Sequence, residues 1–343
     1  MIMTQTTQPQ RIQNPGRIDA RAIRAAIAGG QQVLVQFDTL GEPEPLLADL
    51  DALAANCGTA LTIRIYGYDP RVFDARILRA LPHVASLSID CHWQAIHLET
   101  LGELRHLKRL SLGVYQLAEA DILQLDNLHG LEFLYLGESA KNNIDLAPLR
   151  QYAHLASLAI EGHHQHIDTL ASLPALHELS LYRIKNKVPL DFISEMARLD
   201  RLLLQLGGRE SLAHIEAPLL RKLEVIRVRG LETLGDIGRF PLLQALWVED
   251  QIKLRQIALG PNPALERLNL HTCKTLDSLP GLATLPALRQ LSASETMLDI
   301  DALLAHGLPA SLTHARLRTG RKTRDDAIAA QLAQLGYEQA RPC

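Results

Sequence analysis

The chain has 343 residues, with 35 basic side chains (Lys and Arg) against 38 acidic ones, and a formal net charge of −3 at pH 7. A charge so near neutral argues against a protein that holds nucleic acid through its overall field. The 47% of hydrophobic residues excludes a wholly disordered chain. Leucine alone accounts for 66 residues, which is an unusually large share of the chain. The positions of these leucines along the chain should account for the excess.

The N-terminus and the cysteines bear on the compartment of the protein. The first ten residues, MIMTQTTQPQ, lack the basic start and apolar core of a secretory signal. The four cysteines, Cys57, Cys91, Cys273 and Cys343, are widely spaced, as is usual for reduced thiols. We therefore expect a cytoplasmic protein. Export by a specialised bacterial secretion system is the alternative, because a Thr/Gln-rich start can also serve as a leader.

The N-terminal part of the chain predicts a disordered tail over 1–14 and a helical cap with a degenerate repeat over 15–59. Apolar periodicity and the Gly29-Gly30 pair mark the elements of this part. They are a helix at 18–28, a strand at 33–37, a helix at 44–56 and a strand at 61–65.

The next part, 60–319, contains a repeat of about 23 residues with the pattern L-x-x-L-x-L. Leu, Ile or Val fills every marked place of eleven copies except Ala293 and Ala315. In each copy the last two apolar residues alternate with other residues, which predicts a short strand with one buried face. The copies begin at Val84, Leu107, Leu131, Leu155, Leu176, Leu199, Leu223, Leu243, Leu265, Leu288 and Leu312.

A single copy cannot bury both its strand and its return segment, whereas stacked copies can. We therefore expect a solenoid of about 11–13 repeats, counting the degenerate ones, with 3₁₀ and short α turns in the return segments. Residues 320–343 predict a C-terminal helical cap. Asp325 or Asp326 is expected to cap its helix, which runs to Leu335 and stops at Gly336.

The motif LxxLxLxx(N/C)xL is the signature of the leucine-rich repeat family, and LERLNLHTCKTL at 265–276 matches it with Cys273 at the Asn/Cys place. The chain thus resembles that family, in its bacterial, short-repeat form. The resemblance implies an α/β solenoid: a right-handed horseshoe with a parallel concave sheet, short helices or 3₁₀ turns on the convex side, and helical caps at both ends. It also implies a horseshoe used mainly for binding proteins.

One departure from the family concerns the Asn place, where the Asn of family members hydrogen-bonds backbone amides of neighbouring coils. Its absence predicts looser turns, with water satisfying those amides. The place is occupied by His92, Tyr115, Ser139, His163, Ile184, Gly207, Leu231, Gln251, Cys273 and Thr296.

The outward-facing strand positions predict the binding surface. Arginine and aromatic side chains, which are enriched at protein interfaces, occur there repeatedly. From residue 201 onward these predicted positions hold six arginines against Glu249, so we expect a partner with an acidic patch. The candidate binding residues are Phe133, Tyr135, Tyr182, Arg201, Arg227, Arg229, Trp247, Arg267, His271, Arg316 and Arg318.

Residues of other chemical types do not form a recognisable catalytic or metal-binding pattern. His163, His164 and His166 share one short turn, with no Cys or carboxylate set at zinc spacing, so we predict a surface turn and no metal. The chain has no GxxxxGK[ST], HExxH, GxSxG or GxGxxG motif. We therefore expect no enzymatic activity, no catalytic residue and no cofactor.

The resulting hypothesis is a protein–protein interaction module that binds its partner on the concave face, of the inhibitor or immunity type. Four alternatives stay open. They are an exported effector that binds a host protein, nucleic-acid binding through the Arg-rich C-terminal half, binding through the loops between strands and convex side, and a self-associating scaffold.

Overall fold

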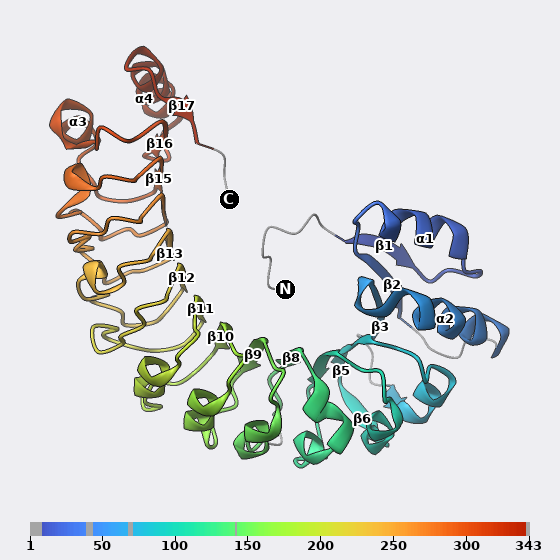
Figure 1. Ribbon diagram of the computed structural model, residues 1–343. Coiled ribbons are helices and arrows are strands. Elements are labelled where there is room, and N and C mark those ends of the chain that lie inside the picture. The colour runs from blue at the N-terminus through green and yellow to red at the C-terminus, as the bar shows by residue number, and fades with distance from the viewer. Residues whose placement is uncertain (1–8, 39–43, 68–70, 141–142, 341–343) are drawn as a thin grey trace. The chain divides into compact units, whose positions relative to one another are not determined.

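The computed structural model describes residues 9–38, 44–67, 71–140 and 143–340. The chain divides into two compact units, Met1–Leu176 and His177–Cys343, which are described in turn. Within each unit, the strands lie on one side and the short helices on the other (Figure 1). In the described part of the chain, no helix is long and apolar enough to cross a membrane.

The N-terminal unit begins with the elements expected for its cap. Helix α1 (Ala20–Ala28) starts after Asp19, whose carboxylate accepts the Ala22 N–H at 2.9 Å, and ends at Gly29. Strand β2 (Val33–Phe37), helix α2 (Glu44–Cys57) and strand β3 (Leu61–Tyr66) follow. The two helices and two strands predicted here are confirmed to within two residues.

Strand β1 (Gln10–Gln13) lies in the segment that the sequence analysis assigned to a disordered tail. It pairs in parallel with β2: the Gln10 N–H donates to the Gln32 carbonyl at 2.9 Å, and the Asn14 N–H donates to the Gln36 carbonyl at 2.8 Å. The polar sequence gives no strand signal, because the pairing uses the open edge of β2 and not a buried side-chain face.

The sheet of the N-terminal unit runs in the order β1-β2-β3-β5-β7-β8-β9, with all neighbours parallel. A separate two-stranded sheet pairs β4 with β6. The remaining strands are β4 (Val72–Asp74), β5 (Ser86–His92), β6 (Gln94–Ile96), β7 (Arg109–Val114), β8 (Phe133–Leu136) and β9 (Ser157–Glu161). The 3₁₀ helices are η1 (Gly58–Ala60), η2 (Ala75–Ala80), η3 (Leu98–Glu103), η4 (Ile122–Gln124), η5 (Asp126–Gly130), η6 (Ala147–Gln151) and η7 (Ile167–Ser172).

The sheet of the C-terminal unit runs in order from β10 to β17, again with all neighbours parallel. Its strands are β10 (Glu178–Tyr182), β11 (Arg201–Gln205), β12 (Lys222–Ile226), β13 (Ala245–Glu249), β14 (Arg267–His271), β15 (Gln290–Ser294), β16 (His314–Arg318) and β17 (Glu338–Gln339). Its helices are η8 (Asp191–Glu195), η9 (Ile237–Arg239), η10 (Leu282–Thr284), α3 (Ile300–Ala302), η11 (Leu303–Gly307) and α4 (Lys322–Gln334).

Helix α4 covers the end of the C-terminal unit and buries Ile328 and Leu332. The expected cap of this helix is wrong: the helix begins at Lys322, one turn earlier. Asp325 instead accepts the Thr319 N–H at 2.7 Å and the Thr319 hydroxyl at 2.8 Å, so it ties the helix to the end of β16.

The core consists of rows of apolar side chains that the parallel register aligns from strand to strand. One row joins Leu202, Leu223, Leu246, Leu268 and Leu291, each at most 2% exposed. Each buried leucine contributes roughly 1.5–3 kcal/mol. The expected solenoid of parallel strands and short return helices is confirmed, and ten of the eleven predicted repeat frames match the observed strands.

Candidate functional site

Alternate residues of β13–β16 project from the sheet on the side away from the core. The strand register places them in three rows, which together we call the C-terminal sheet face. The rows are Ala245–Arg267–Gln290–His314, Trp247–Asn269–Ser292–Arg316 and Glu249–His271–Ser294–Arg318.

The end of this face at β13 and β14 is held by local contacts. The half-buried Trp247 donates its Nε1–H to Glu249 Oε2 at 2.9 Å, and its ring centroid lies 5.5 Å from that of His271. His271 Nδ1 lies 2.8 Å from the Ser294 hydroxyl. Burial lowers the pKa of His271. The nearby Arg316 charge lowers this pKa further, whereas the Glu249 carboxylate raises it. The indole therefore presents a fixed apolar surface.

The positive charge of the face resides on Arg267, Arg316 and Arg318. None of the three guanidinium groups makes a hydrogen bond or ion pair in the part of the chain that the structure describes. The first two are half-buried and the third is exposed. Five donors on each planar guanidinium are thus directed at ligands or solvent, and the geometry suits carboxylates. Of the predicted site residues, Trp247, Arg267, His271, Arg316 and Arg318 come together here.

Two residues of the middle row were not among the predicted site residues. Asn269 is 3% exposed and Ser292 is 1% exposed. Asn269 Oδ1 and Ser292 Oγ have no hydrogen-bond partner among the described residues. The repeat pattern predicts that these two residues lie between Trp247 and Arg316 in the row. No sequence signal, however, indicates that neighbouring side chains will bury such small polar side chains.

The predicted positions of Arg227 and Arg229 on the sheet face are wrong. The repeat was framed on Leu223, which placed Val225 outward, but Val225 is buried in β12 and Ile226 is half-buried on the sheet face. Arg227 follows the strand with φ of 50°, and its Nε lies 2.6 Å from Asp250 Oδ2. Arg229 is exposed in the turn beyond it.

This error has a simple cause, since the segment LRKLEVIRV fits the L-x-x-L-x-L pattern in two frames three residues apart. The frame that starts at Leu220 is the one observed, and it places Lys222, Glu224 and Ile226 outward. Lys222 Nζ lies 2.9 Å from Glu224 Oε2. The outward positions of β11–β16 therefore carry five bases and two acids in place of the six arginines and one acid expected.

The other predicted site residues lie elsewhere. Arg201 is exposed on β11, 4.0 Å from Glu178 and 3.9 Å from Asp200, and Tyr182 ends β10. Phe133 and Tyr135 belong to β8 of the N-terminal unit.

In the N-terminal unit, the corresponding sheet face is internally satisfied over β1–β5. The Arg64 guanidinium bonds the Asp90 carboxylate at 3.0 Å and Gln36 Oε1 at 3.1 Å, and lies 4.5 Å over the Tyr66 ring. Gln13 donates to the Tyr66 hydroxyl at 2.9 Å. Such a closed network has fewer unused donors to offer a ligand than the C-terminal sheet face.

The aromatic residues Phe133 and Tyr135 of β8 are likewise engaged. The Arg109 guanidinium lies 4.3 Å over the Phe133 ring, and the Tyr135 hydroxyl donates to Glu161 Oε2 at 2.9 Å. These contacts fill the hydrogen-bonding and cation–π capacity that suggested an interface role.

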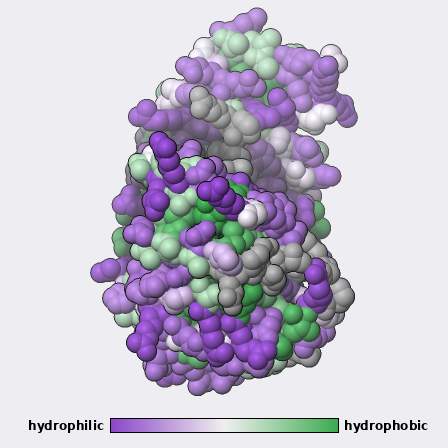
Figure 2. Space-filling model, turned by 90° about the vertical axis from the view of Figure 1, so that its right-hand side faces the viewer, coloured by the Kyte–Doolittle hydropathy of each residue, from purple (hydrophilic) through white to green (hydrophobic). Residues whose placement is uncertain are grey.

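Sequence reasoning also missed an exposed aromatic pair of the N-terminal unit. Trp93 is 48% exposed and Tyr115 is 45% exposed, and their ring centroids lie 4.7 Å apart. Both follow strand ends, outside the L-x-x-L-x-L positions, and the repeat pattern gave Tyr115 only as an occupant of the Asn place, where a buried side chain is expected. Figure 2 shows that hydrophilic residues cover most of the visible surface, with hydrophobic patches between them.

Comparison with known proteins gives structural matches only. No family model and no curated protein matches the sequence. Among solved structures, an internalin (inlF) from Listeria monocytogenes superimposes with a TM-score of 0.50 and 19% identity, over 82% of this chain and 77% of that one. A Toll-like receptor, TLR13, solved in a complex with ssRNA13, gives a TM-score of 0.50 and 15% identity over 90% of this chain.

The chain has the leucine-rich repeat fold. It spans 77% of the internalin and 51% of TLR13, so it is about half the length of that receptor. At 15–19% identity, these likenesses establish the fold alone.

The Asn place of the leucine-rich repeat, which we call the ladder position, is filled at four places by side chains that perform the same task. His92 Nε2 lies 3.1 Å from the Ile65 carbonyl, and Gln251 Nε2 donates to the Val225 carbonyl at 3.3 Å. His163 lies 2.9 Å from the Gly137 carbonyl, while Cys273 Sγ lies 3.6 Å from the Val248 carbonyl. Each acceptor belongs to the preceding coil. The expectation of looser turns is therefore wrong at these four places.

A second set of side chains bonds the preceding coil on the return side of the leucine-rich repeats. The two asparagines each donate to two main-chain carbonyls that also accept a backbone N–H of the turn, and the serine hydroxyl lies within hydrogen-bond distance of two. The set comprises Asn127 with Leu101 and Leu104, Asn262 with Ile237 and Phe240, and Ser311 with Leu285 and Leu288.

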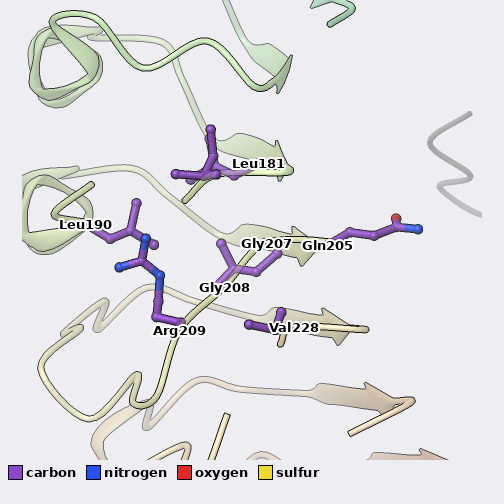
Figure 3. Close-up of a pocket in the computed structure, with 9 residues that line it drawn as sticks. Leu181, Leu190, Gln205, Gly207, Gly208, Arg209 and Val228 are labelled. Atoms are coloured by element: carbon purple, nitrogen blue, oxygen red, sulfur yellow. The ribbon is translucent and has the colours of Figure 1, made fainter. Parts of the chain in front are cut away.

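A small pocket within the C-terminal unit is lined by apolar side chains of neighbouring repeats (Figure 3). Arg209 reaches across it toward Leu190 and donates to the Val188 carbonyl at 2.8 Å. Gly207 allows this close packing, because a Cβ there would lie 2.6 Å from the Ile184 carbonyl oxygen. Burial lowers the pKa of Arg209. Its guanidinium braces the turn, and we assign it no ligand.

The three histidines of the 163–166 turn go to different places. His163 is buried at its ladder position, His164 Nδ1 lies 3.0 Å from the Gly162 carbonyl, and His166 Nδ1 lies 2.6 Å from Asp145 Oδ1. The prediction of a surface turn is thus wrong for His163. Within the described ranges, no group of three or more His, Cys, Asp or Glu residues is placed to hold a metal ion.

Proposed function

We propose that this chain is a protein-binding module. Its C-terminal sheet face would bind an acidic patch on the surface of the partner protein. The observation that carries the proposal is the pair of Arg267 and Arg316, whose guanidinium groups make no hydrogen bond or ion pair in the described chain. They share one sheet face with the exposed Arg318 and the fixed indole of Trp247. Arginine and tryptophan are the residue types that dominate binding energy at protein interfaces.

The rigidity of the surface supports the same function. Each strand is held by its parallel neighbours, and Gln251 and Cys273 also bond main-chain carbonyls of the preceding coil. A partner would therefore meet a preformed surface, and little ordering entropy would be lost on binding. Guanidinium groups that are half-buried gain more from a carboxylate than exposed ones, because solvent screens them less.

Within this function we favour an inhibitor or immunity-type role in the cytoplasm, in which the sheet face masks the acidic surface of a toxin or enzyme. In this role the module itself performs no catalytic step. An exported effector that binds a host protein would use the same surface. A secretion assay with the first 40 residues fused to a reporter separates the two roles.

Nucleic acid is the second candidate partner, because the same three arginines could contact phosphates and Trp247 could stack on a base. The TLR13 structure of this fold contains a single-stranded RNA. Two acids, Glu224 and Glu249, stand among the bases, which favours the protein partner. Binding that weakens steeply with salt, in proportion to the phosphates neutralised, would instead favour nucleic acid.

The test is affinity capture from lysate of the cells that make the protein, read by mass spectrometry. Wild type is compared with Arg267→Glu/Arg316→Glu and with the control Arg198→Glu/Arg289→Glu, whose arginines are exposed outside the strands. We expect one acidic protein to be retained by wild type and by the control but lost from the sheet-face variant. Equal capture by all three proteins contradicts the proposed surface.

A further inference from the structure

The middle row of the C-terminal sheet face contains two polar side chains that are buried without a partner. Asn269 and Ser292 are register partners on β14 and β15, and both lie on the face and not in the core. They are 3% and 1% exposed, and neither Asn269 Oδ1 nor Ser292 Oγ has a hydrogen-bond partner among the described residues.

Buried polar atoms of folded proteins are almost always hydrogen-bonded, since an unpaired one loses its interaction with water and gains nothing in return. Other polar side chains of this face are engaged: Ser294 contacts His271, and Trp247 donates to Glu249. The two unpaired atoms therefore belong to register partners in the middle of the row, between Arg316 and the engaged Trp247.

The charge around the pair specifies the ligand. Arg316 follows Ser292 in the same row, and Arg267 precedes Asn269 on its own strand with one residue between them. Neither guanidinium has a partner in the described chain, so the surroundings attract an anion that a hydroxyl can also bond. Asn269 Oδ1 is an acceptor and requires a donor from the same ligand.

We propose that Asn269, Ser292 and Arg316 form a subsite for one acidic residue, Asp or Glu, in an extended segment of the partner protein. Its carboxylate accepts from the Ser292 hydroxyl and the Arg316 guanidinium, and its main-chain N–H donates to Asn269 Oδ1. Arg316 turns aside from the row to admit the carboxylate. The subsite rests on the proposed function and adds to it the chemistry that the partner presents.

The experiment uses the full chain with Trp93→Phe, so that Trp247 is the sole fluorescent indole. The probe is a hexaglutamate peptide with blocked ends, and the neutral hexaglutamine peptide and tripolyphosphate serve as comparisons. Variants Ser292→Ala and Asn269→Leu are measured beside Ser180→Ala, whose serine is 1% exposed at the middle position of β10. Thermal melting of each variant reports folding.

We expect hexaglutamate to change the Trp247 fluorescence and hexaglutamine to leave it unchanged. Ser292→Ala and Asn269→Leu each weaken the hexaglutamate affinity by about tenfold, the effect of about one charge-assisted hydrogen bond. Both leave the melting temperature unchanged or raise it, because a buried unpaired polar atom is removed. Ser180→Ala binds like the parent.

Any of three results would overturn the subsite. The first is no fluorescence response to hexaglutamate at millimolar concentration, and the second is equal hexaglutamate affinity of Ser292→Ala and Ser180→Ala. The third is tripolyphosphate binding that Ser292→Ala and Asn269→Leu weaken as much as they weaken hexaglutamate binding. If Arg267→Glu/Arg316→Glu still abolishes partner capture in that case, the docking face stands and only the subsite fails. If capture is also unaffected, the proposed function fails with it.

Discussion

The Nε2 atom of His163 lies 2.9 Å from the carbonyl oxygen of Gly137, one coil earlier in the chain. Its Nδ1 accepts the N–H of Ile144 at 3.1 Å, so the proton of the neutral ring is on Nε2 and both ring nitrogens are used. A histidine thus does here what asparagine does in the family that the sequence resembles. At four ladder positions of this chain, side chains other than asparagine bond a carbonyl of the preceding coil.

Replacement of His163 by leucine is expected to destabilise the fold. His163→Leu leaves the Gly137 carbonyl and the Ile144 N–H without partners, which should lower the free energy of unfolding by about 3 kcal/mol. Urea denaturation measures the change. His154→Leu, at an exposed histidine of the same unit, should stay within about 0.5 kcal/mol of wild type.

The same residue predicts a pH dependence. Burial lowers the pKa of His163 from its ordinary value of 6.5, so below that pH the unfolded chain binds more protons than the folded one. The contribution of His163 is therefore constant above about pH 6.5, and stability falls as the pH drops below it. Denaturation midpoints measured from pH 7.5 to 5.0 should fall less steeply for His163→Gln than for wild type, because glutamine cannot titrate and Gln251 shows that it fits a ladder position. Parallel curves would contradict this role.

The frame of the repeat at β12 is open to a direct test. Val225 is buried and Ile226 lies half-buried on the sheet face. Val225→Asp places an unpaired charge in the core and should unfold the C-terminal unit, whereas Ile226→Asp should cost about 1 kcal/mol or less. Circular dichroism melts of the two variants distinguish the frames. The reverse order of stability would restore the frame that starts at Leu223.

A half-buried arginine braces the return side of the C-terminal unit. Arg239 donates to the carbonyls of Ile215 at 2.8 Å, Leu212 at 3.0 Å and Leu234 at 2.7 Å, and lies 4.2 Å over the Phe240 ring. Burial lowers the pKa of Arg239. Arg239→Met keeps the apolar stem but removes the donor to all three carbonyls, of which only that of Leu212 also accepts a backbone N–H among the described residues, so a loss of about 3 kcal/mol is expected in denaturant unfolding.

Arg239→Lys is the informative companion, since an ammonium has three donors on one nitrogen and cannot span carbonyls of two coils. It should recover only part of the stability lost by the methionine variant. Full recovery would show that the charge, and not the fork of donors, is what the turn requires.

The repeat frames were predictable because each copy must bury two strand residues, and burial restricts those places to apolar side chains. The frame at β12 failed because apolar residues at 220, 223, 225, 226 and 228 satisfy two alignments, and only contact with neighbouring coils selects one. Strand β1 was missed since its pairing depends on main-chain groups, which every residue carries.

The candidate site was predictable only in part. The outward places of Trp247, Arg267 and Arg316 follow from strand alternation, and the structure confirms them. Which charges are already paired does not follow from alternation: Arg64, Arg109 and Lys222 have close partners, whereas Arg267 and Arg316 have none among the described residues. Ion pairing depends on whether a side chain can reach a partner on a neighbouring strand. The residue pattern of a single strand does not predict this.

The docking of a partner on the C-terminal sheet face is tested most directly by site-specific photo-crosslinking in the cells that make the protein. A benzophenone side chain is placed at Ser294 on the face or at the exposed Ala197 outside the strands. The account predicts one covalent adduct with an acidic protein from position 294 and none from position 197. An adduct from 197, with none from 294, would contradict it.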